Sequence, residues 1–320
     1  MQKTNIRNRR FLVQACATAL LALGACTGIA GENAPVKKQI LCTTFPIFQI
    51  ARNVTQGRDG VALSLMLPAG LGCPHDYALT PQDMRRMASA QILIANGLGL
   101  EEFLADAAVK GNTNLVVVDT SRGIAGLLDY TEDDDHDEPA GHAHEHSGHN
   151  PHLFASPRMV AKIAVNIATA LAKADPAGQA LYEKNAADYA ARMTKLADEF
   201  SAAGKWLRNN RIVTQHGVFD YLAQDMNLEI VAVIAEHSNQ EPSAAQMLAV
   251  IKTIREKKAG AIFTEPQYPA RTAKTLAKET GIPVAALDPV ASGPDNAGLD
   301  YYETTMRANL ETLKKVLGTK

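Results

Sequence analysis

Short runs of apolar residues alternate along the chain with segments whose apolar positions recur every three or four residues. The runs are almost continuously apolar, as expected for strands covered on both faces, and their alternation with helices is typical of parallel βαβ units. In the first half we expect strands at Ile40–Thr43, Val61–Leu67, Gln91–Ala95 and Leu115–Val118, with helices at Ile47–Gln56, Pro81–Ser89 and Glu101–Ala108. In the second half we expect strands at Ile212–Gln215, Glu229–Ile234, Ala261–Thr264 and Val284–Leu287, with helices at Val218–Met226, Ser243–Lys257, Ala270–Glu279 and Tyr301–Leu317. The pattern predicts an α/β fold of two lobes, each with a four-stranded parallel sheet flanked by helices.

The longest helical pattern lies between these two halves. Its apolar residues alternate at intervals of four and three, which keeps them on one side of a helix. They are Tyr182, Ala186, Tyr189, Met193, Leu196, Phe200, Ala203 and Leu207. Asp175-Pro176 is typical of a helix start, with Asp as N-cap and Pro at the first helical position. A helix of about 30 residues would be roughly 45 Å long. We expect one long rigid helix that joins the lobes, and a helical hairpin or a coiled-coil dimer is the alternative.

The N-terminus has the pattern of an export signal. A positively charged start precedes the apolar stretch Phe11–Leu23, which is too short to span a bilayer comfortably. Leu23-Gly24-Ala25-Cys26 resembles the bacterial lipobox, in which cleavage precedes a cysteine that then carries a lipid. We expect a signal peptide at residues 1–25, lipidation of Cys26, and a tether at residues 26–38 that anchors a periplasmic protein to the membrane. A plain secretory signal is the alternative.

The rest of the chain divides into an N-terminal lobe at residues 39–155, a helical linker at residues 156–209 and a C-terminal lobe at residues 210–320. The composition of the whole chain, 46% hydrophobic and 21% charged, is that of a globular protein. The formal net charge of −2 leaves no basic surface for a nucleic acid, so we exclude that class of partner.

Residues 129–149 differ sharply from the rest of the N-terminal lobe. This segment contains eight acids and five of the nine histidines of the chain, with no Lys or Arg. Such a composition cannot bury a core, so we expect a disordered loop. Its histidines favour weak auxiliary metal binding, and a solvated acidic linker is the alternative. The histidines are His136, His142, His144, His146 and His149.

Two cysteines remain after the export segment and Cys26 are set aside. Cys42 and Cys73 are an even pair in an oxidising compartment. Cys42 ends the apolar run of the first strand, and Cys73 lies in the loop after the second, at the carboxyl ends of strands expected to be neighbours. We expect a disulfide between them, although Cys73 lies two residues before His75 and could instead be a thiolate metal ligand.

Histidines and one acid follow several of the expected strands. His75 follows the second strand of the first lobe, while His216 and Asp288 follow the first and last strands of the second lobe. Open parallel sheets bind ligands outside the carboxyl ends of their strands, so these side chains should face one site. His152 lies at the far end of the acidic loop, and His237 is expected at the polar rim of the site, with a spare metal ligand as the alternative.

Three imidazoles and one carboxylate suit zinc, which accepts tetrahedral sites with nitrogen and oxygen ligands. Manganese prefers shells richer in oxygen. We therefore expect His75, His152, His216 and Asp288 to bind one Zn²⁺, with manganese as the alternative metal. A zinc-dependent hydrolase is the alternative class of protein, but a fourth protein ligand would close the site to water and no HExxH-type sequence supplies a base.

Several motifs carry a family resemblance. The histidine motifs are Gly72-Cys73-Pro74-His75-Asp76-Tyr77, Asn150-Pro151-His152-Leu153-Phe154 and Thr214-Gln215-His216-Gly217-Val218-Phe219. The C-terminal motifs are Glu241-Pro242-Ser243, Phe263-Thr264-Glu265-Pro266-Gln267-Tyr268 and Leu287-Asp288-Pro289. Together they resemble the metal-specific solute-binding proteins of bacterial ABC importers, and the histidine-rich loop resembles the zinc-importing branch. Cys73 and Ala155-Ser156 stand where relatives often have acids, so the residues around the expected ligands depart from the family pattern.

The resemblance implies a binding protein and not an enzyme. It would hold zinc between two lobes joined by a long helix and deliver it to an ABC permease with its ATPase subunit. We expect a monomer whose further partners include periplasmic zinc chaperones. An adhesin or a zinc store without a transporter is not excluded by the sequence.

Overall fold

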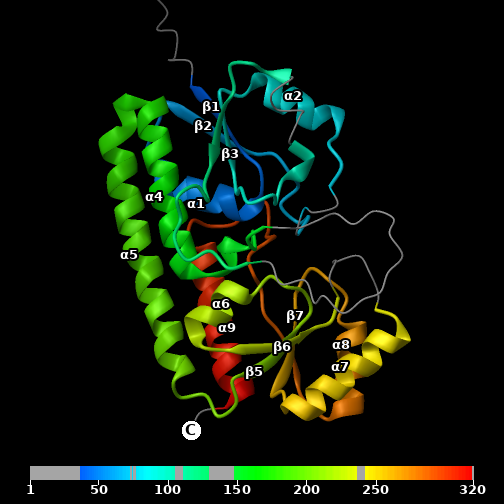
Figure 1. Cartoon of the computed structure of the whole chain (residues 1–320). Helices are drawn as coiled ribbons and strands as arrows, with labels where there is room; N and C mark the ends of the chain where they lie inside the picture. The colour runs from blue at the N-terminus through cyan, green and yellow to red at the C-terminus, as the bar shows by residue number, and fades with distance from the viewer. Residues whose placement is uncertain are drawn as a thin grey trace, which may run out of the picture. The chain divides into compact units, whose positions relative to one another are not determined.

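The computed structural model describes residues 37–72, 74, 77–104, 111–129, 148–235 and 242–318, within the compact unit Lys37–Lys320. These residues contain two parallel sheets of four strands each (Figure 1), which confirms the predicted fold class. The export signal, Cys26, Cys73, His75, His237 and four of the five loop histidines lie outside the described residues. No helix in the described part has the length and apolar character needed to cross a membrane.

The first sheet has the strand order β2-β1-β3-β4, with every neighbouring pair parallel. Its strands are β1 (Lys38–Cys42), β2 (Val61–Leu65), β3 (Ile92–Ala95) and β4 (Val116–Asp119). Helices α1 (Phe45–Thr55) and α2 (Pro81–Ser89) connect them. Of the expected helix Glu101–Ala108, the described part is a 3₁₀ turn, η1 (Glu102–Leu104).

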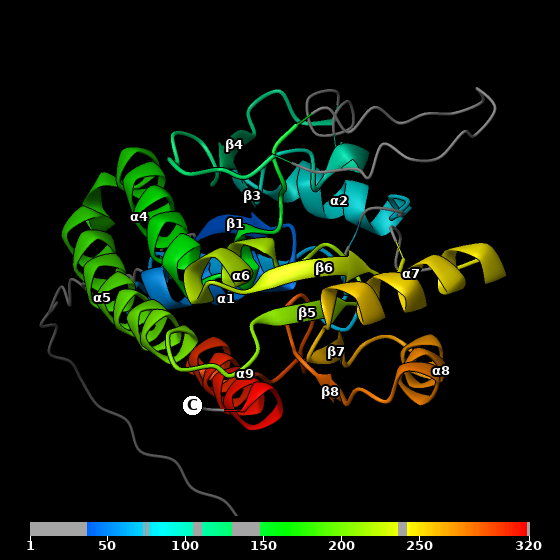
Figure 2. The same cartoon turned by 60° about the horizontal axis from the view of Figure 1, so that its bottom comes forward.

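The second sheet repeats this order as β6-β5-β7-β8, again with parallel pairs (Figure 2). Its strands are β5 (Arg211–Thr214), β6 (Glu229–Val233), β7 (Ala261–Thr264) and β8 (Val284–Ala286). Its helices are α6 (Asp220–Met226), α7 (Ala244–Lys257), α8 (Arg271–Thr280) and α9 (Tyr301–Leu317). In both sheets the first strand in sequence is central, so the loops that follow it lie at the middle of the carboxyl edge.

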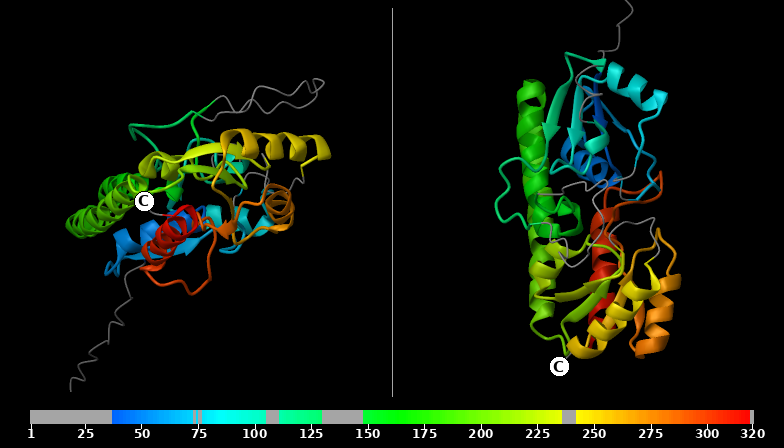
Figure 3. Two further views of the ribbon diagram at one scale, coloured as in Figure 1. Left: turned by 90° about the horizontal axis from the view of Figure 1, so that it is seen from below. Right: turned by 45° about the vertical axis from the view of Figure 1, so that its right-hand side comes forward.

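Two helices lie between the lobes in sequence. They are α4 (Pro157–Ala174), which follows the 3₁₀ turn η2 (Leu153–Ala155), and α5 (Gln179–Gly204), which follows the turn η3 (Pro176–Gly178). They pack side by side (Figure 1), and α5 contacts α1 of the first lobe as well as α6 and α9 of the second. Figure 3 shows α9 beside α5 in two further views. The long joining helix was therefore predicted; α4 lies within the expected helical linker at residues 156–209, but its packing along α5 was not foreseen.

The long helix begins later than predicted. Asp175 does not cap it, since its carboxylate binds the guanidinium of Arg58 at 2.9 Å and accepts the hydroxyl of Tyr182 at 2.6 Å. At its other end, Gly204 packs against α6, where an added Cβ would lie 1.9 Å from the carbonyl oxygen of Met226. Only glycine fits at that contact.

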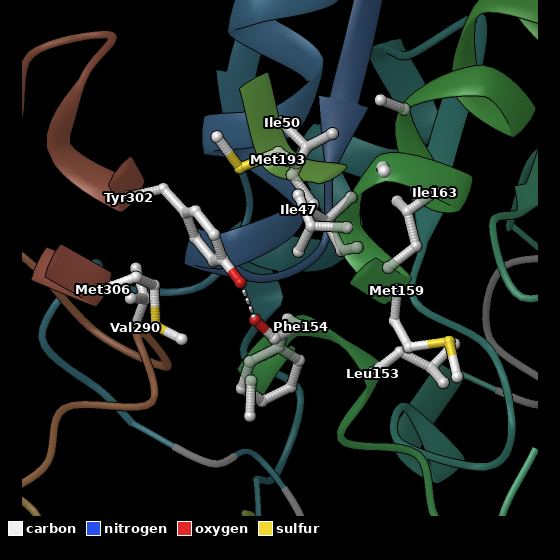
Figure 4. Packing of buried hydrophobic residues seen from close by; sticks show 14 of the residues in the cluster. Ile47, Ile50, Leu153, Phe154, Met159, Ile163, Met193, Val290, Tyr302 and Met306 are labelled. Atoms are coloured by element: carbon white, nitrogen blue, oxygen red, sulfur yellow. Dashed lines mark hydrogen bonds between the residues drawn. The ribbon is translucent and has the colours of Figure 1, made fainter. Parts of the chain in front are cut away.

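The largest of three apolar clusters among the described residues extends through both lobes and the joining helices. Figure 4 shows part of it, with Ile47 and Ile50 of α1 near Met193 of α5. Tyr302 of α9 is fully buried and donates its hydroxyl hydrogen to the carbonyl oxygen of Phe154 at 2.7 Å. The turn that follows His152 is thereby fixed to the last helix of the second lobe.

Candidate metal site

His152 lies at the N-terminal end of the turn η2 and is only 4% exposed. The amide oxygen of Asn150 accepts two hydrogen bonds from it, one from the backbone N–H and one from ring nitrogen Nδ1, both at 2.9 Å. A ring that donates from Nδ1 carries its lone pair on Nε2, which is the nitrogen that can ligate a metal. The fold therefore presents His152 in a tautomer suited to metal binding.

His216 follows β5 and is 8% exposed. Its Nδ1 lies 2.5 Å from Oε1 of Glu265, and its ring packs edge-on against Tyr268 with the centroids 4.8 Å apart. The carboxylate of Glu265 accepts the Nδ1–H and again leaves Nε2 as the nitrogen with the lone pair.

Glu265 belongs to the motif Phe263–Tyr268, but the sequence alone assigns it no role. It follows β7, the sheet neighbour of β5, and is 2% exposed. Its second carboxylate oxygen accepts a hydrogen bond from Nε2 of Gln267 at 2.8 Å, and its backbone N–H donates to Gln215. An acid directly after a buried strand was the available signal, but its partner became visible only when β5 and β7 were paired.

Asp288 follows β8, and hydrogen bonds to its backbone groups fix its position. Asn309 of α9 accepts its N–H at 3.0 Å and donates to its carbonyl oxygen at 2.7 Å, while the N–H of Val290 donates to its carboxylate at 2.8 Å. Burial raises the pKa of Asp288, the bond from Val290 lowers it, and the charge of Glu265 raises it again. The charge of Glu265 acts on Asp288 because the two carboxylates follow the neighbouring strands β7 and β8 at the same edge of the second sheet.

The described start of the loop that carries His75 packs against this edge. Gly72 has a φ of +82°, and an added Cβ would lie 2.9 Å from the hydroxyl oxygen of Tyr268. Nearby, the N–H of Gly293 donates to the carbonyl oxygen of Ala69 at 2.9 Å. Gly72 therefore lies beside the tyrosine that packs on His216.

His152 and the His216 turn are connected through Asn150, which is 3% exposed. Its amide nitrogen donates to the carbonyl oxygen of Gly217 at 3.1 Å and to the carboxylate of Asp220 at 3.0 Å. Its carbonyl oxygen accepts from the hydroxyl of Tyr221 at 2.8 Å. Burial is the main influence on Asp220 and raises its pKa, against the hydrogen bonds that it accepts.

The four predicted ligands are not assembled within the described residues. No group of three or more His, Cys, Asp or Glu side chains there is arranged to hold a metal, and His75 lies outside the described part. Of the loop histidines, His149 is described, and its Nδ1 lies 3.0 Å from Oδ1 of Asp129, both side chains being exposed. The complete ligand set remains a prediction.

The predicted disulfide is not formed at Cys42, which is a fully buried free thiol. Burial raises the pKa of this thiol well above its ordinary value. The expected pairing of Cys42 with Cys73 is therefore not supported, and Cys42 packs as a small apolar side chain in the core.

Two parallel sheets with histidines and acids beyond their carboxyl ends, joined by paired helices, place the chain in the class of two-lobed α/β proteins that bind a ligand at the ends of their strands. The chain belongs to the family described as zinc-uptake complex component A, periplasmic (ZnuA), whose family model matches residues 40–316.

Individual relatives agree with this membership. The zinc-binding protein AdcA of Streptococcus pyogenes serotype M3 is 29% identical over 290 residues, which cover 87% of this chain and 56% of that protein. The chain thus spans about half the length of the AdcA relatives that it matches. The high-affinity zinc uptake system protein ZnuA of Bacillus subtilis is 28% identical over 97% of both chains. A crystal structure of ZnuA has a TM-score of 0.73 at 26% identity and covers 88% of this chain and all of that one.

Proposed function

We propose that this protein binds one Zn²⁺ tightly in the periplasm and delivers it to an ABC permease and its ATPase subunit. Membership in the zinc-uptake family supports this role, as do the relatives named for zinc binding and for high-affinity zinc uptake. The export signal and the lipidation of Cys26 would keep the protein at the membrane where a permease can receive the metal.

We infer that His75, His152, His216 and Asp288 are the four ligands. The observation that carries this inference is the state of the two described histidines. Both are buried, and an oxygen atom of Asn150 or Glu265 engages the Nδ1 of each. Zinc-binding histidines usually donate their second ring nitrogen to such an oxygen, which fixes the ring and makes the ligating nitrogen more basic.

The donor set favours zinc over manganese, because three imidazoles and one carboxylate make a nitrogen-rich tetrahedral site. The same set favours capture over catalysis. A hydrolase keeps one zinc position open for water, whereas Asp288 as a fourth ligand would fill it.

The remaining features are assigned to supporting roles. His136, His142, His144, His146 and His149 would gather zinc weakly near the tight site, since clustered acids and histidines raise the local concentration of cations. Periplasmic zinc chaperones would supply metal to a monomeric protein.

A pair of histidine variants tests the ligand set. His216→Ala removes a proposed ligand, and His237→Ala removes a histidine from the expected rim. Competition with a chelating fluorophore should show that His216→Ala weakens zinc binding by more than about 100-fold, above the loss typical of outer-shell partners. His237→Ala should leave the affinity nearly unchanged, and equal losses in the two variants would contradict the proposed ligands.

A further inference from the structure

The side chain of Asn150 uses all of its hydrogen-bonding capacity between the two described histidine ligands. Its oxygen accepts from the backbone N–H and from Nδ1 of His152, and its nitrogen donates to Gly217 and Asp220. A primary amide has two donor hydrogens and two acceptor lone pairs, so no capacity is left over. Gly217 directly follows His216, so one side chain contacts the residues that place both ligands.

The orientation of this amide is determined by its surroundings. The groups beside the amide nitrogen are a carbonyl oxygen and a carboxylate, both acceptors, and the backbone N–H of His152 is a donor beside the amide oxygen. Rotating the amide by 180° would place donor against donor and acceptor against acceptor. The oxygen must therefore face His152, so the ring nitrogen that it contacts must be the protonated one.

We propose that Asn150 is a positioning residue that fixes the tautomer of His152 and holds it in register with the His216 turn, and that Asp220 fixes the orientation of Asn150. This inference rests on the proposed function, in which both histidines bind zinc. The backbone of Asn150 strengthens the arrangement. Its carbonyl oxygen accepts from Tyr221 of α6, and its N–H donates to the carbonyl oxygen of Leu128 at 2.7 Å.

The pair Asn150 and Asp220 can be tested by exchanging their polarity. Asn150→Asp keeps an oxygen for His152 but places a carboxylate against that of Asp220. Outer-shell partners of metal sites contribute about 10- to 100-fold in affinity, and we expect a loss in that range for this variant. Asp220→Asn keeps an acceptor for the amide of Asn150 but removes its charge, so we expect a smaller loss than in Asn150→Asp, at most about tenfold.

The double variant N150D/D220N restores the contact between positions 150 and 220 with donor and acceptor exchanged, while the carbonyl oxygen of Gly217 lacks its donor in both the single and the double variant. The new amide at position 220 donates to the new carboxylate at position 150, whose other oxygen still accepts from His152. Its zinc affinity, measured by chelator competition, should recover at least about tenfold relative to Asn150→Asp, because coupled neighbours are not additive. A role limited to packing would give no recovery. Unchanged affinity in Asn150→Asp, or a double variant as weak as that single one, would overturn the proposal.

A measurement on the unmodified protein keeps the proposal testable if a variant does not fold. In metal-free protein at about pH 8, above the ordinary pKa of histidine, nitrogen-15 NMR should find His152 protonated at Nδ1. Protonation at Nε2 would overturn the proposal. If the unmodified protein binds no zinc, the proposed function fails, whereas normal binding with the wrong tautomer or with no loss in Asn150→Asp refutes only the role of Asn150.

Discussion

Glu265 gives the sharpest test of how the fold prepares its histidines. Replacing it with alanine removes the acceptor for Nδ1 of His216, now at 2.5 Å, and for Nε2 of Gln267, now at 2.8 Å. A buried donor left without a partner costs about 1–3 kcal/mol. We expect Glu265→Ala to destabilise the metal-free protein by about that amount for the His216 N–H, which lies in a side chain that is 11% exposed.

The effect on zinc follows from the same contact. Without Glu265, the ring of His216 is neither held in place nor polarised, and the loss for such a partner is about 10- to 100-fold in affinity. This corresponds to about 1.4–2.7 kcal/mol of binding free energy. We therefore expect Glu265→Ala to lower the zinc association constant by this factor while leaving one site per chain.

Glu265→Gln separates geometry from charge. The new amide oxygen can still accept from His216, and Gln267 can rotate its own amide to accept the new N–H, since its Oε1 has no hydrogen-bond partner in the structure. The loss should therefore be smaller than for alanine, at most about tenfold, because a neutral acceptor is the weaker partner.

Asp175→Asn provides the matched control for these variants. It neutralises a buried carboxylate near Lys38, at the amino end of β1, opposite the edge that faces the site. It should lower stability through the lost partner of Arg58 and leave zinc affinity unchanged. Zinc binding in Glu265→Ala as tight as in this control, measured by chelator competition, would refute the reasoning.

Two further predictions concern Asp288 and the histidine-rich segment. Because burial raises the pKa of Asp288, its ionisation costs stability as the pH rises from the ordinary carboxyl range through the raised value. Asp288→Asn should therefore raise the melting temperature of metal-free protein at neutral pH and reduce the further rise caused by zinc, as calorimetry would show; a lower melting temperature without metal would contradict this. Deleting residues 131–147 should remove weakly bound zinc and leave the affinity of the tight site nearly intact, as equilibrium dialysis would show. Loss of the tight site would mean that the loop histidines are primary ligands.

The regular elements of the fold were predictable because their signals are local. The helices Pro81–Ser89 and Tyr301–Leu317 and the strand Ala261–Thr264 have the bounds expected from their patterns. Each has an unambiguous apolar period or a proline at its start. Strand alternation then defined the two parallel sheets.

The elements that failed depend on distant partners. Asp175 has the local signature of a helix cap, but Arg58 and Tyr182 bind its carboxylate instead. One long helix was expected to join the lobes within a helical linker at residues 156–209, and α5 is that helix; the packing of α4 along α5 and of α1 and α9 on the same core could not be foreseen. No periodicity in α4 alone indicates which helix its apolar face covers.

In the candidate site, too, local signals were readable from the sequence and tertiary contacts were not. From sequence alone, His216 was indicated by its place after a strand, and His152 by its place in a histidine motif at the end of the acidic loop. Glu265 and Asn150 could not be given roles, because each acts through a contact set by tertiary structure. Glu265 meets His216 only because β5 and β7 are neighbours, and Asn150 meets Asp220 only because the chain before α4 packs on α6.

Metal titration of the purified mature protein tests the central claim most directly. The protein, freed of metal and with residues 131–147 deleted to remove weak sites, would be titrated with Zn²⁺ by calorimetry in the absence and presence of excess Mn²⁺. We predict one tight zinc site per chain whose affinity excess manganese barely changes, since three imidazoles and one carboxylate favour zinc. Displacement of zinc by manganese at comparable concentrations, or the absence of a stoichiometric site, would contradict the account.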